Sequence, residues 1–196
     1  MKTLFLLTAV LMTTSSCSSG LTRKGYEEAT HTVINEAGPI QLRKYPTLQL
    51  VQTEMADSND GGFMRLFRYI DKGNEKEQKI AMTSPVFVEM ENNKRKMSFV
   101  LPADMASEDV PAPVSAKVKH VENQPGLYAT YRYNGRVEVS PIEVYEKLEA
   151  WMEEHGYIQN GKEIHAFYDP PWTPAPMRRN ELLIPVVKKG KGADNQ

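Results

Sequence analysis

Short segments with alternating apolar and polar residues follow one another along most of the chain. In residues 47–55, TLQLVQTEM, every second side chain falls on the same side of an extended backbone. This period of two is typical of a strand with one buried face. The same reading predicts further strands at residues 32–36, 40–45, 79–90, 94–102, 115–122, 127–135, 163–169 and 181–187.

A first helix is predicted where the spacing changes, in residues 61–74, GGFMRLFRYIDKGN. Its apolar residues recur at helical intervals and predict a buried stripe: Phe63, Leu66, Phe67 and Ile70. Residues 58–60 offer N-caps before this segment, and Gly73 ends it.

A second helix is predicted over residues 141–155. Ser140 and Glu143 have the spacing of a capping box, Pro141 takes the first helical position, and Gly156 follows the last turn. The predicted buried stripe of this helix consists of Tyr145, Leu148 and Met152.

The order strand, helix, strand, strand occurs twice. The first copy runs from PTLQLVQTEM through the first helix to IAMTSPVFVE, and the second runs from PGLYATYRYNG through the second helix to IHAFYDPP. One unit alone would leave a face of its sheet uncovered, so the two must pack against each other. We therefore expect an α+β fold, a curved sheet or barrel that carries two helices and is built from a duplicated β-α-β-β unit.

The N-terminal residues 1–16 are expected to be a signal peptide. Lys2 precedes an apolar run, Leu4–Met12, which is followed by small polar residues. A helix that spans a membrane needs roughly 20 apolar residues, about twice the length of this run. We therefore expect the segment to be cleaved and the protein to be exported.

Cys17 is the only cysteine and stands where the signal would end, so it has no partner for an intramolecular disulfide. The arrangement resembles a bacterial lipobox, in which the cysteine is lipidated; an ordinary secretory signal is the alternative. We expect a tether over residues 17–24, a folded domain over 25–188 and a polar tail over 189–196. Acyl chains on Cys17 would hold the protein at a membrane surface, in the cell envelope or periplasm.

The charge balance argues against some classes of partner. The 196 residues include 24 basic and 25 acidic side chains, so nothing indicates a general attraction to nucleic acid or to anionic lipid. The proline-rich, acidic segment at residues 102–114 is expected to be a linker.

Sequence signatures of catalysis, such as a Walker loop, GxSxG or HExxH, do not occur in the chain. Ser84 precedes a proline in a predicted strand and is a weak candidate for a nucleophile. The four histidines do not have the spacing of metal ligands, and a structural role is favoured for each: His31, His120, His155 and His165. We therefore predict no catalytic residue and no metal site.

The first helix carries the most informative polar position. Met64 and Arg68 lie four residues apart, on one side of Phe67. A flat aromatic ligand with carboxylates needs apolar surface for its rings and cations near its rim. The alternative is that Phe63 and Phe67 are core residues and that Arg68 is solvated.

Residues 168–186, YDPPWTPAPMRRNELLIPV, combine several prolines, a tryptophan and two arginines. The prolines favour an ordered loop between two strands. We expect Trp172 to pack over the edge of the barrel or to line a cleft, and Glu181 to pair with Arg178 or Arg179.

Taken together, these segments resemble the SOUL haem-binding protein family. RLFRYIDKGN, KIAMTSPV, MSFVLP and YDPPWTPAPMRRNELLIPV match in order and spacing, over about residues 25–187. The resemblance implies a distorted eight-stranded antiparallel β-barrel with two helices, and non-covalent binding of haem or a related porphyrin beside the first helix. Haem-binding members use an apolar residue and a neighbouring cation on this helix, at positions that match Phe67 and Arg68.

The leading hypothesis is a non-enzymatic protein that sequesters, carries or buffers haem at the cell envelope. Phe63, Met64 and Phe67 would form the apolar wall of the site, and Arg68 would contact a propionate. A second hypothesis is an effector-binding module for a small molecule other than a porphyrin. A third is a hydrolase of the same architecture that uses a carboxylate such as Glu138 or Glu181.

Overall fold

The structure, a computed structural model, describes residues 25–56, 61–91, 94–135 and 142–190. Several predictions lie outside these ranges: the signal peptide, the lipidation of Cys17, the tether over 17–24, most of the polar tail, and the positions Glu138, Ser140 and Pro141.

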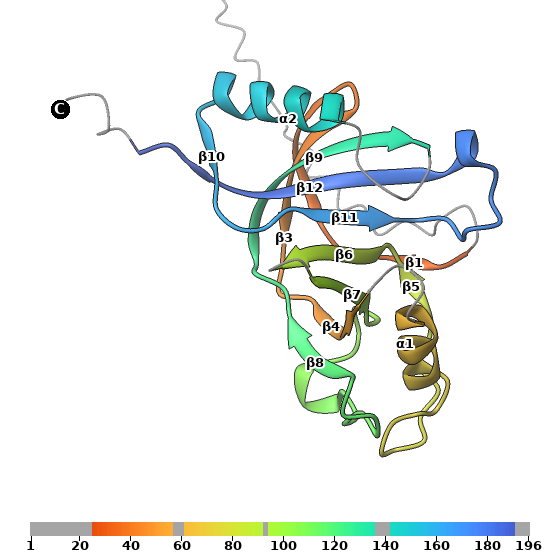
Figure 1. Cartoon of the computed structure of the whole chain (residues 1–196). Helices are drawn as coiled ribbons and strands as arrows, with labels where there is room; N and C mark the ends of the chain where they lie inside the picture. The colour runs from red at the N-terminus through yellow and green to blue at the C-terminus, as the bar shows by residue number, and fades with distance from the viewer. Residues whose placement is uncertain (1–24, 57–60, 92–93, 136–141, 191–196) are drawn as a thin grey trace, which may run out of the picture.

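The described residues form two helices and a large antiparallel sheet (Figure 1). The ten strands of the sheet are β2 (Thr32–Ala37), β3 (Ile40–Tyr45), β4 (Gln49–Met55), β6 (Val86–Glu91), β7 (Lys94–Val100), β8 (Lys119–Glu122), β9 (Gly126–Asn134), β10 (Tyr157–Gln159), β11 (Ile164–Phe167) and β12 (Arg179–Lys188). The helices are α1 (Gly62–Ile70) and α2 (Ile142–Glu154). The α+β class is therefore confirmed.

The order of the strands in the sheet is β2-β3-β9-β12-β11-β6-β7-β4-β8, and β10 pairs with β12. No pairing among the described strands joins β2 to β8, so the sheet is curled but not closed. The predicted eight-stranded barrel is thus not confirmed. The sequence pattern also missed β10 and the short strand β1 (Glu27–Glu28). The strand predicted over residues 79–90 contains two strands, β5 (Thr83–Ser84) and β6, and β5 pairs in parallel with β1, apart from the large sheet.

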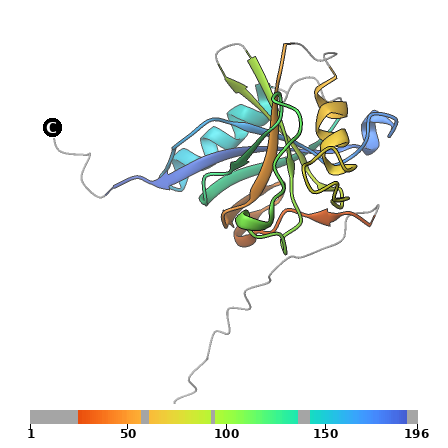
Figure 2. The same ribbon diagram turned by 90° about the horizontal axis from the view of Figure 1, so that it is seen from below.

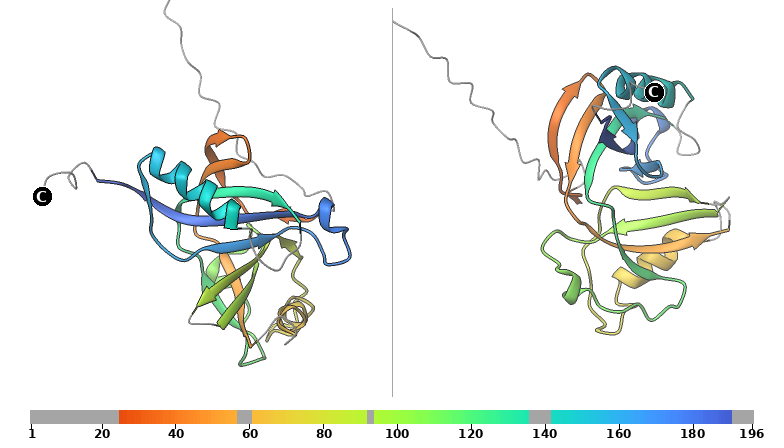
Figure 3. Two further views of the ribbon diagram at one scale, coloured as in Figure 1. Left: turned by 45° about the horizontal axis from the view of Figure 1, so that its top comes forward. Right: turned by 90° about the vertical axis from the view of Figure 1, so that its left-hand side faces the viewer.

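Both helices cover the outer face of the curled sheet, one towards each of its two ends. Because the sheet curls, they lie on opposite sides of the molecule. In the right-hand view of Figure 3 the strands lie between α2 and α1. The cluster under α1 contains Val51, Leu66, Tyr69, Ile70, Phe99 and Leu101. The cluster under α2 contains Leu42, Ala129, Leu148, Trp151, Leu182 and Ile184. Alternate residues of the same strands point to the opposite, inner face and form a third cluster, which includes Tyr45, Leu50, Phe87, Ile164 and Leu183.

The segment predicted to be a linker, residues 102–114, is part of the packed structure. It contains a 3-10 turn, η1 (Ser107–Asp109), and Val110 packs against the cluster under α1. Tyr69 Oη donates a 2.8 Å hydrogen bond to the carbonyl oxygen of Pro111. The segment therefore covers the cluster under α1. Its prolines lack an N–H group, but their carbonyl oxygens can still accept hydrogen bonds, as Pro111 O does.

The N-terminal strand β1 lies across one end of the curled sheet (Figures 1 and 2). It pairs with β5 in parallel, and Ala29 N donates a 2.8 Å hydrogen bond to Ser84 O. Glu28 forms a 2.7 Å ion pair with Arg179 at the start of β12. These contacts place the beginning of the described chain beside the segment that connects β11 to β12.

Candidate functional site

Helix α1 is anchored to the sheet by a narrow set of positions. Leu66 and Tyr69 are almost fully buried, and Gly62 and Ile70 lie on the same side of the helix. On one flank, Arg65 donates hydrogen bonds to Thr53 Oγ1 (3.0 Å) and to the carbonyl oxygen of Glu54 (2.7 Å) in β4. The orientation of the helix about its own axis is fixed by these contacts.

This orientation leaves an apolar face of α1 at the surface. Phe63, Met64 and Phe67 are 43%, 48% and 40% exposed. The rings of Phe63 and Phe67 are 6.3 Å apart and nearly parallel, with an angle of 13°. Phe63 also meets the buried ring of Phe99 edge-on at 5.1 Å. The four residues Phe63, Met64, Phe67 and Arg68 are called the α1 face below.

The prediction that Phe63 and Phe67 belong to the buried stripe of the helix is therefore wrong. Tyr69 takes one of the sheet-facing positions instead, because its ring is buried while its hydroxyl reaches Pro111 O. The helical period alone could not separate the two arrangements, since a tyrosine looks amphipathic in sequence. Phe99, which supports Phe63 from below, was not singled out by the sequence.

Arg68 lies in the last turn of α1, where the partial negative charge of the helix end favours a cation. Its side chain is exposed and makes no hydrogen bond or ion pair with any other residue that the structure describes. Gly73 N donates a 2.8 Å hydrogen bond to Arg68 O and closes the helix end. A Cβ atom at position 73 would lie only 2.5 Å from Arg68 O, so this close approach requires glycine.

The inner face of the sheet holds a buried ionic network centred on Glu181. Arg43 donates to both carboxylate oxygens of Glu181, at 2.6 and 3.1 Å, and Tyr168 Oη donates at 2.8 Å. Arg179 adds a 3.0 Å contact from its Nη2 atom. The expected pairing of Glu181 with a neighbouring arginine is thus observed for Arg179, whereas Arg43 was not anticipated.

Burial alone would raise the pKa of Glu181, but the charge and hydrogen bonds of Arg43, with help from Arg179 and Tyr168, lower it to about 2. Burial raises the pKa of Tyr168, so its hydroxyl stays protonated and donates. An ionised carboxylate that accepts from three side chains is stabilised in its charged form and is a weak proton acceptor. This environment does not favour the hydrolase hypothesis for Glu181.

The loop that follows Tyr168 is held at its base by the same network. The guanidinium carbon of Arg179 lies 3.7 Å from the centre of the Tyr168 ring, and Arg179 N donates to Asp169 Oδ2 at 2.8 Å. Trp172 is 81% exposed, so the expectation that it packs over the edge of the sheet or lines a cleft is wrong. The reason is that the loop closes on itself through hydrogen bonds between its own residues.

The histidines and Ser84 have local surroundings of different kinds. Three histidines form short contacts: His31 Nδ1 with Ala29 O (2.9 Å), His120 Nε2 with Gln49 Oε1 (2.6 Å) and His155 Nδ1 with Trp151 O (2.8 Å). His165 Nε2 lies 3.7 Å from Glu163 Oε1. Ser84 is buried beside β1. The described residues contain no group of three or more potential metal ligands from His, Cys, Asp and Glu.

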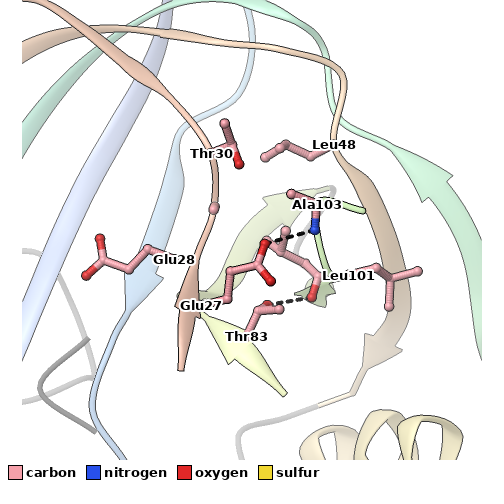
Figure 4. A pocket seen from close by; sticks show the side chains of 9 residues that line it. Glu27, Glu28, Thr30, Leu48, Thr83, Leu101 and Ala103 are labelled. Atoms are coloured by element: carbon pink, nitrogen blue, oxygen red, sulfur yellow. Dashed lines mark hydrogen bonds between the residues drawn. The ribbon is translucent and has the colours of Figure 1, made fainter. Parts of the chain in front are cut away.

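A small recess lies between β1 and the segment after β7 (Figure 4). Its volume is about 10 Å³, roughly the room for one water molecule. The residues that line it include Glu27, Thr30, Leu48, Thr83, Leu101 and Ala103. A ligand with several fused rings cannot enter this recess.

The chemistry of the α1 face fits a tetrapyrrole. Two parallel aromatic rings and a thioether offer apolar, polarisable contacts to a flat macrocycle. Arg68 offers a cation beside them for a carboxylate.

Among the described residues, no helix has the length and apolar character that crossing a membrane requires.

Solved structures with the same fold share little sequence with this chain. The C-terminal domain of EcmrR aligns with a TM-score of 0.57 and 13% identity, over 76% of this chain and 97% of that domain. An uncharacterised conserved protein from Listeria innocua gives 0.59 and 11%, over 76% and 92% of the two chains. A hydrolase from Listeria innocua gives 0.58 and 12%, over 79% and 94%. At such low identities these likenesses establish the fold alone.

Comparison with curated proteins gave no match. A model of one protein family, described as SOUL heme-binding protein, matches residues 26–185, which is most of the chain and nearly all of the described domain. The chain therefore belongs to the SOUL heme-binding protein family.

Proposed function

We propose that this protein binds haem or a related tetrapyrrole non-covalently on the α1 face and does not act on it as an enzyme. One observation carries the proposal: α1 holds Phe63, Met64 and Phe67 at the surface, although their apolar character favours burial. Family membership gives the ligand class that would cover them. The helix keeps Arg68 next to this apolar surface.

Burial of the α1 face would supply most of the affinity. Covering the exposed part of each of these half-buried side chains contributes about 1 kcal/mol, and part of the sum is lost to the cost of association. Phe63 is held in place by Phe99, so little side-chain freedom is lost on binding. Arg68 would pair with a propionate at the rim, where solvent limits its contribution to about 1 kcal/mol or less.

The biological setting we propose is the cell envelope. The signal-like residues 1–16 and Cys17 support export followed by lipidation, which would hold the domain at a membrane surface. A haem carrier there would keep a poorly soluble macrocycle out of water. Sequestration, carriage and buffering all use the same binding step.

We also infer that the domain is a duplicated β-α-β-β unit arranged as a distorted, open eight-stranded barrel. In the first unit α1 follows β4, and β7 pairs with both β4 and β6. In the second unit α2 follows β9, and β12 pairs with both β9 and β11. The preceding strands β3 and β8 each pair with the first strand of the other unit, so the run β3-β9-β12-β11-β6-β7-β4-β8 has the same order from both ends.

A second candidate ligand class is a smaller aromatic acid. The α1 face is an open surface with a single cation, and such a surface would also accept a ligand with fewer rings. Native mass spectrometry of the protein purified from its own host separates the two classes by the mass of the bound molecule.

The proposed function is tested by titrating the protein with hemin and recording the Soret region. We expect a saturable spectral shift at micromolar hemin, and a loss of affinity of about tenfold or more for Phe67→Asp. Ile142→Asp is the matched control, because Ile142 is an exposed apolar residue on the other helix. A flat difference spectrum, or equal losses in the two variants, would rule out the α1 face as the site.

A further inference from the structure

The loop between β11 and β12, residues 168–178, projects from the end of the sheet (Figures 1 and 2). Its tip, residues 170–177 with the sequence PPWTPAPM, contains no charged side chain. Trp172 is 81% exposed and Met177 is 59% exposed. Trp172 is thus the most exposed of the large apolar side chains that the structure describes. A protein surface would ordinarily place polar groups here.

The tip is held in one shape by its own contacts. Arg178 Nε donates a 2.6 Å hydrogen bond to Thr173 O, and its Nη2 atom donates to Pro171 O. The 3-10 turn η2 (Ala175–Met177) begins after Pro174, and Met177 N donates to Pro174 O at 2.8 Å. Arg178 therefore directs its charge into the loop, and the prolines limit the backbone freedom that binding would otherwise remove.

The base of the loop is tied to the start of the described chain. Arg179, the first residue after the loop, forms ion pairs with Glu28 of β1 (2.7 Å) and with Glu181 (3.0 Å). The chain therefore enters the domain next to this loop. Residues 18–24 would separate Gly25 from a lipidated Cys17, and seven residues span at most roughly 25 Å. An anchor at Cys17 would keep the loop close to the membrane surface.

We propose that the tip of this loop inserts Trp172 into the membrane–water interface and gives the anchored domain a second contact with lipid. The proposal rests on the envelope location given under the proposed function. Tryptophan favours this interface because its ring is apolar while its N–H can bond to water or headgroups. An anchor at Cys17 would hold the protein at one point only, so an additional apolar contact would add to the attachment and orient the domain.

A lipid surface suits the tip better than a protein partner does. A stable protein interface buries about 800 Å² on each partner and includes a polar rim. The tip is eight residues long and carries no charge that could form such a rim. A fluid lipid interface makes no demand for a complementary shape.

Tryptophan fluorescence of the mature, lipidated protein on vesicles tests the proposal. The chain has two tryptophans, and Trp151 is a buried residue of α2, at 7% exposure. Trp151→Phe makes Trp172 the only reporter, and Trp172→Phe is the matched control. On vesicles of phosphatidylethanolamine and phosphatidylglycerol with brominated acyl chains, we expect a blue shift and quenching of Trp172, and no change for Trp151.

A second arm removes the acyl anchor. In a Cys17→Ser background, Trp172→Ala should weaken sedimentation with the same vesicles by about tenfold, the effect of withdrawing one large apolar side chain from lipid. Val114→Ala is the control, because Val114 is also highly exposed. The proposal would be overturned if brominated lipid did not quench the fluorescence of Trp172 while a water-soluble quencher still did.

Hemin separates this proposal from the proposed function. If Trp172 becomes protected only when hemin is added, the loop belongs to the tetrapyrrole site and the lipid contact is wrong. If Trp172→Ala binds hemin like the wild type but loses vesicle binding, the lipid contact is supported whatever the hemin affinity is. Unchanged melting temperatures would show that the exposed substitutions leave the fold intact.

Discussion

Arg43 and Glu181 are 138 positions apart in the sequence and form a two-point ion pair, with contacts of 2.6 and 3.1 Å, in the interior of the curled sheet. Both side chains are almost fully buried. Removing one member of a buried pair leaves an uncompensated charge, which destabilises a protein by about 3–5 kcal/mol. We therefore expect Glu181→Gln to lower the free energy of unfolding by this amount in urea titrations.

The matched control for this variant is Glu143→Gln. Glu143 pairs with Lys147 on the exposed side of α2 at 2.6 Å. Solvent screens such a pair, so its loss should leave the urea midpoint unchanged. Equal effects of the two substitutions would show that the interior network adds no stability.

The same network predicts how stability depends on pH. The pKa of Glu181 is lowered from 4.5 to about 2, so the unfolded chain binds this proton more readily than the folded one. The stabilisation is therefore complete above pH 4.5 and is lost as the pH falls towards 2. A double variant, Arg43→Met with Glu181→Leu, should have a shallower dependence in this window; an identical slope would contradict the assignment.

The stability of the C-terminal end of α1 should depend on having glycine at position 73. A methyl group there would lie 2.5 Å from Arg68 O, and the overpacking should cost about 1–3 kcal/mol in Gly73→Ala. Gly190→Ala is the control, because a Cβ at that position meets no atom within 4 Å. Thermal unfolding measures both variants, and equal melting temperatures would show that the helix end tolerates the added group.

Arg68 should recognise the acid groups of the ligand rather than its rings. Arg68→Glu should weaken hemin binding by about fivefold, since an exposed ion pair contributes about 1 kcal/mol or less. The same variant should bind the dimethyl ester of hemin as the wild type does. Lys147→Glu on α2 controls for the change in net charge. Loss of affinity for both ligands would assign Arg68 a structural role.

The strands could be predicted from sequence because exposed and buried positions alternate in part of β4, whereas β12 is buried on both faces and forms a continuous apolar run. Residues 47–55 alternate clearly, and β4 occupies Gln49–Met55 as a result. The rotation of α1 could not be predicted, because both Tyr69 and Phe67 could face the sheet, and the contacts that favour Tyr69, such as its hydrogen bond to Pro111 O, are made with distant segments. The pair of Arg43 and Glu181 could not be predicted either, because the two residues lie on strands that are distant in sequence and the local pattern does not show that these strands come together.

The residues of the α1 face were selected from the sequence by their type, and the structure shows that they are exposed. Met64 and Arg68 could be placed beside Phe67 from the helical period alone. That Phe63 is held edge-on by Phe99 depends on the register of β7 under the helix, which no local signal specifies. The ligand class comes from the family and not from the geometry.

The most direct test of the account is to locate a bound tetrapyrrole on the protein by NMR. The chain has 10 methionines, so methyl labelling gives probes on several elements at once. Zinc protoporphyrin, which is diamagnetic, should shift the methyl resonance of Met64 on the α1 face through its ring current and leave that of Met152, a buried residue of α2, unchanged. Shifts confined to other methionines, with Met64 unaffected at saturation, would contradict the proposed site.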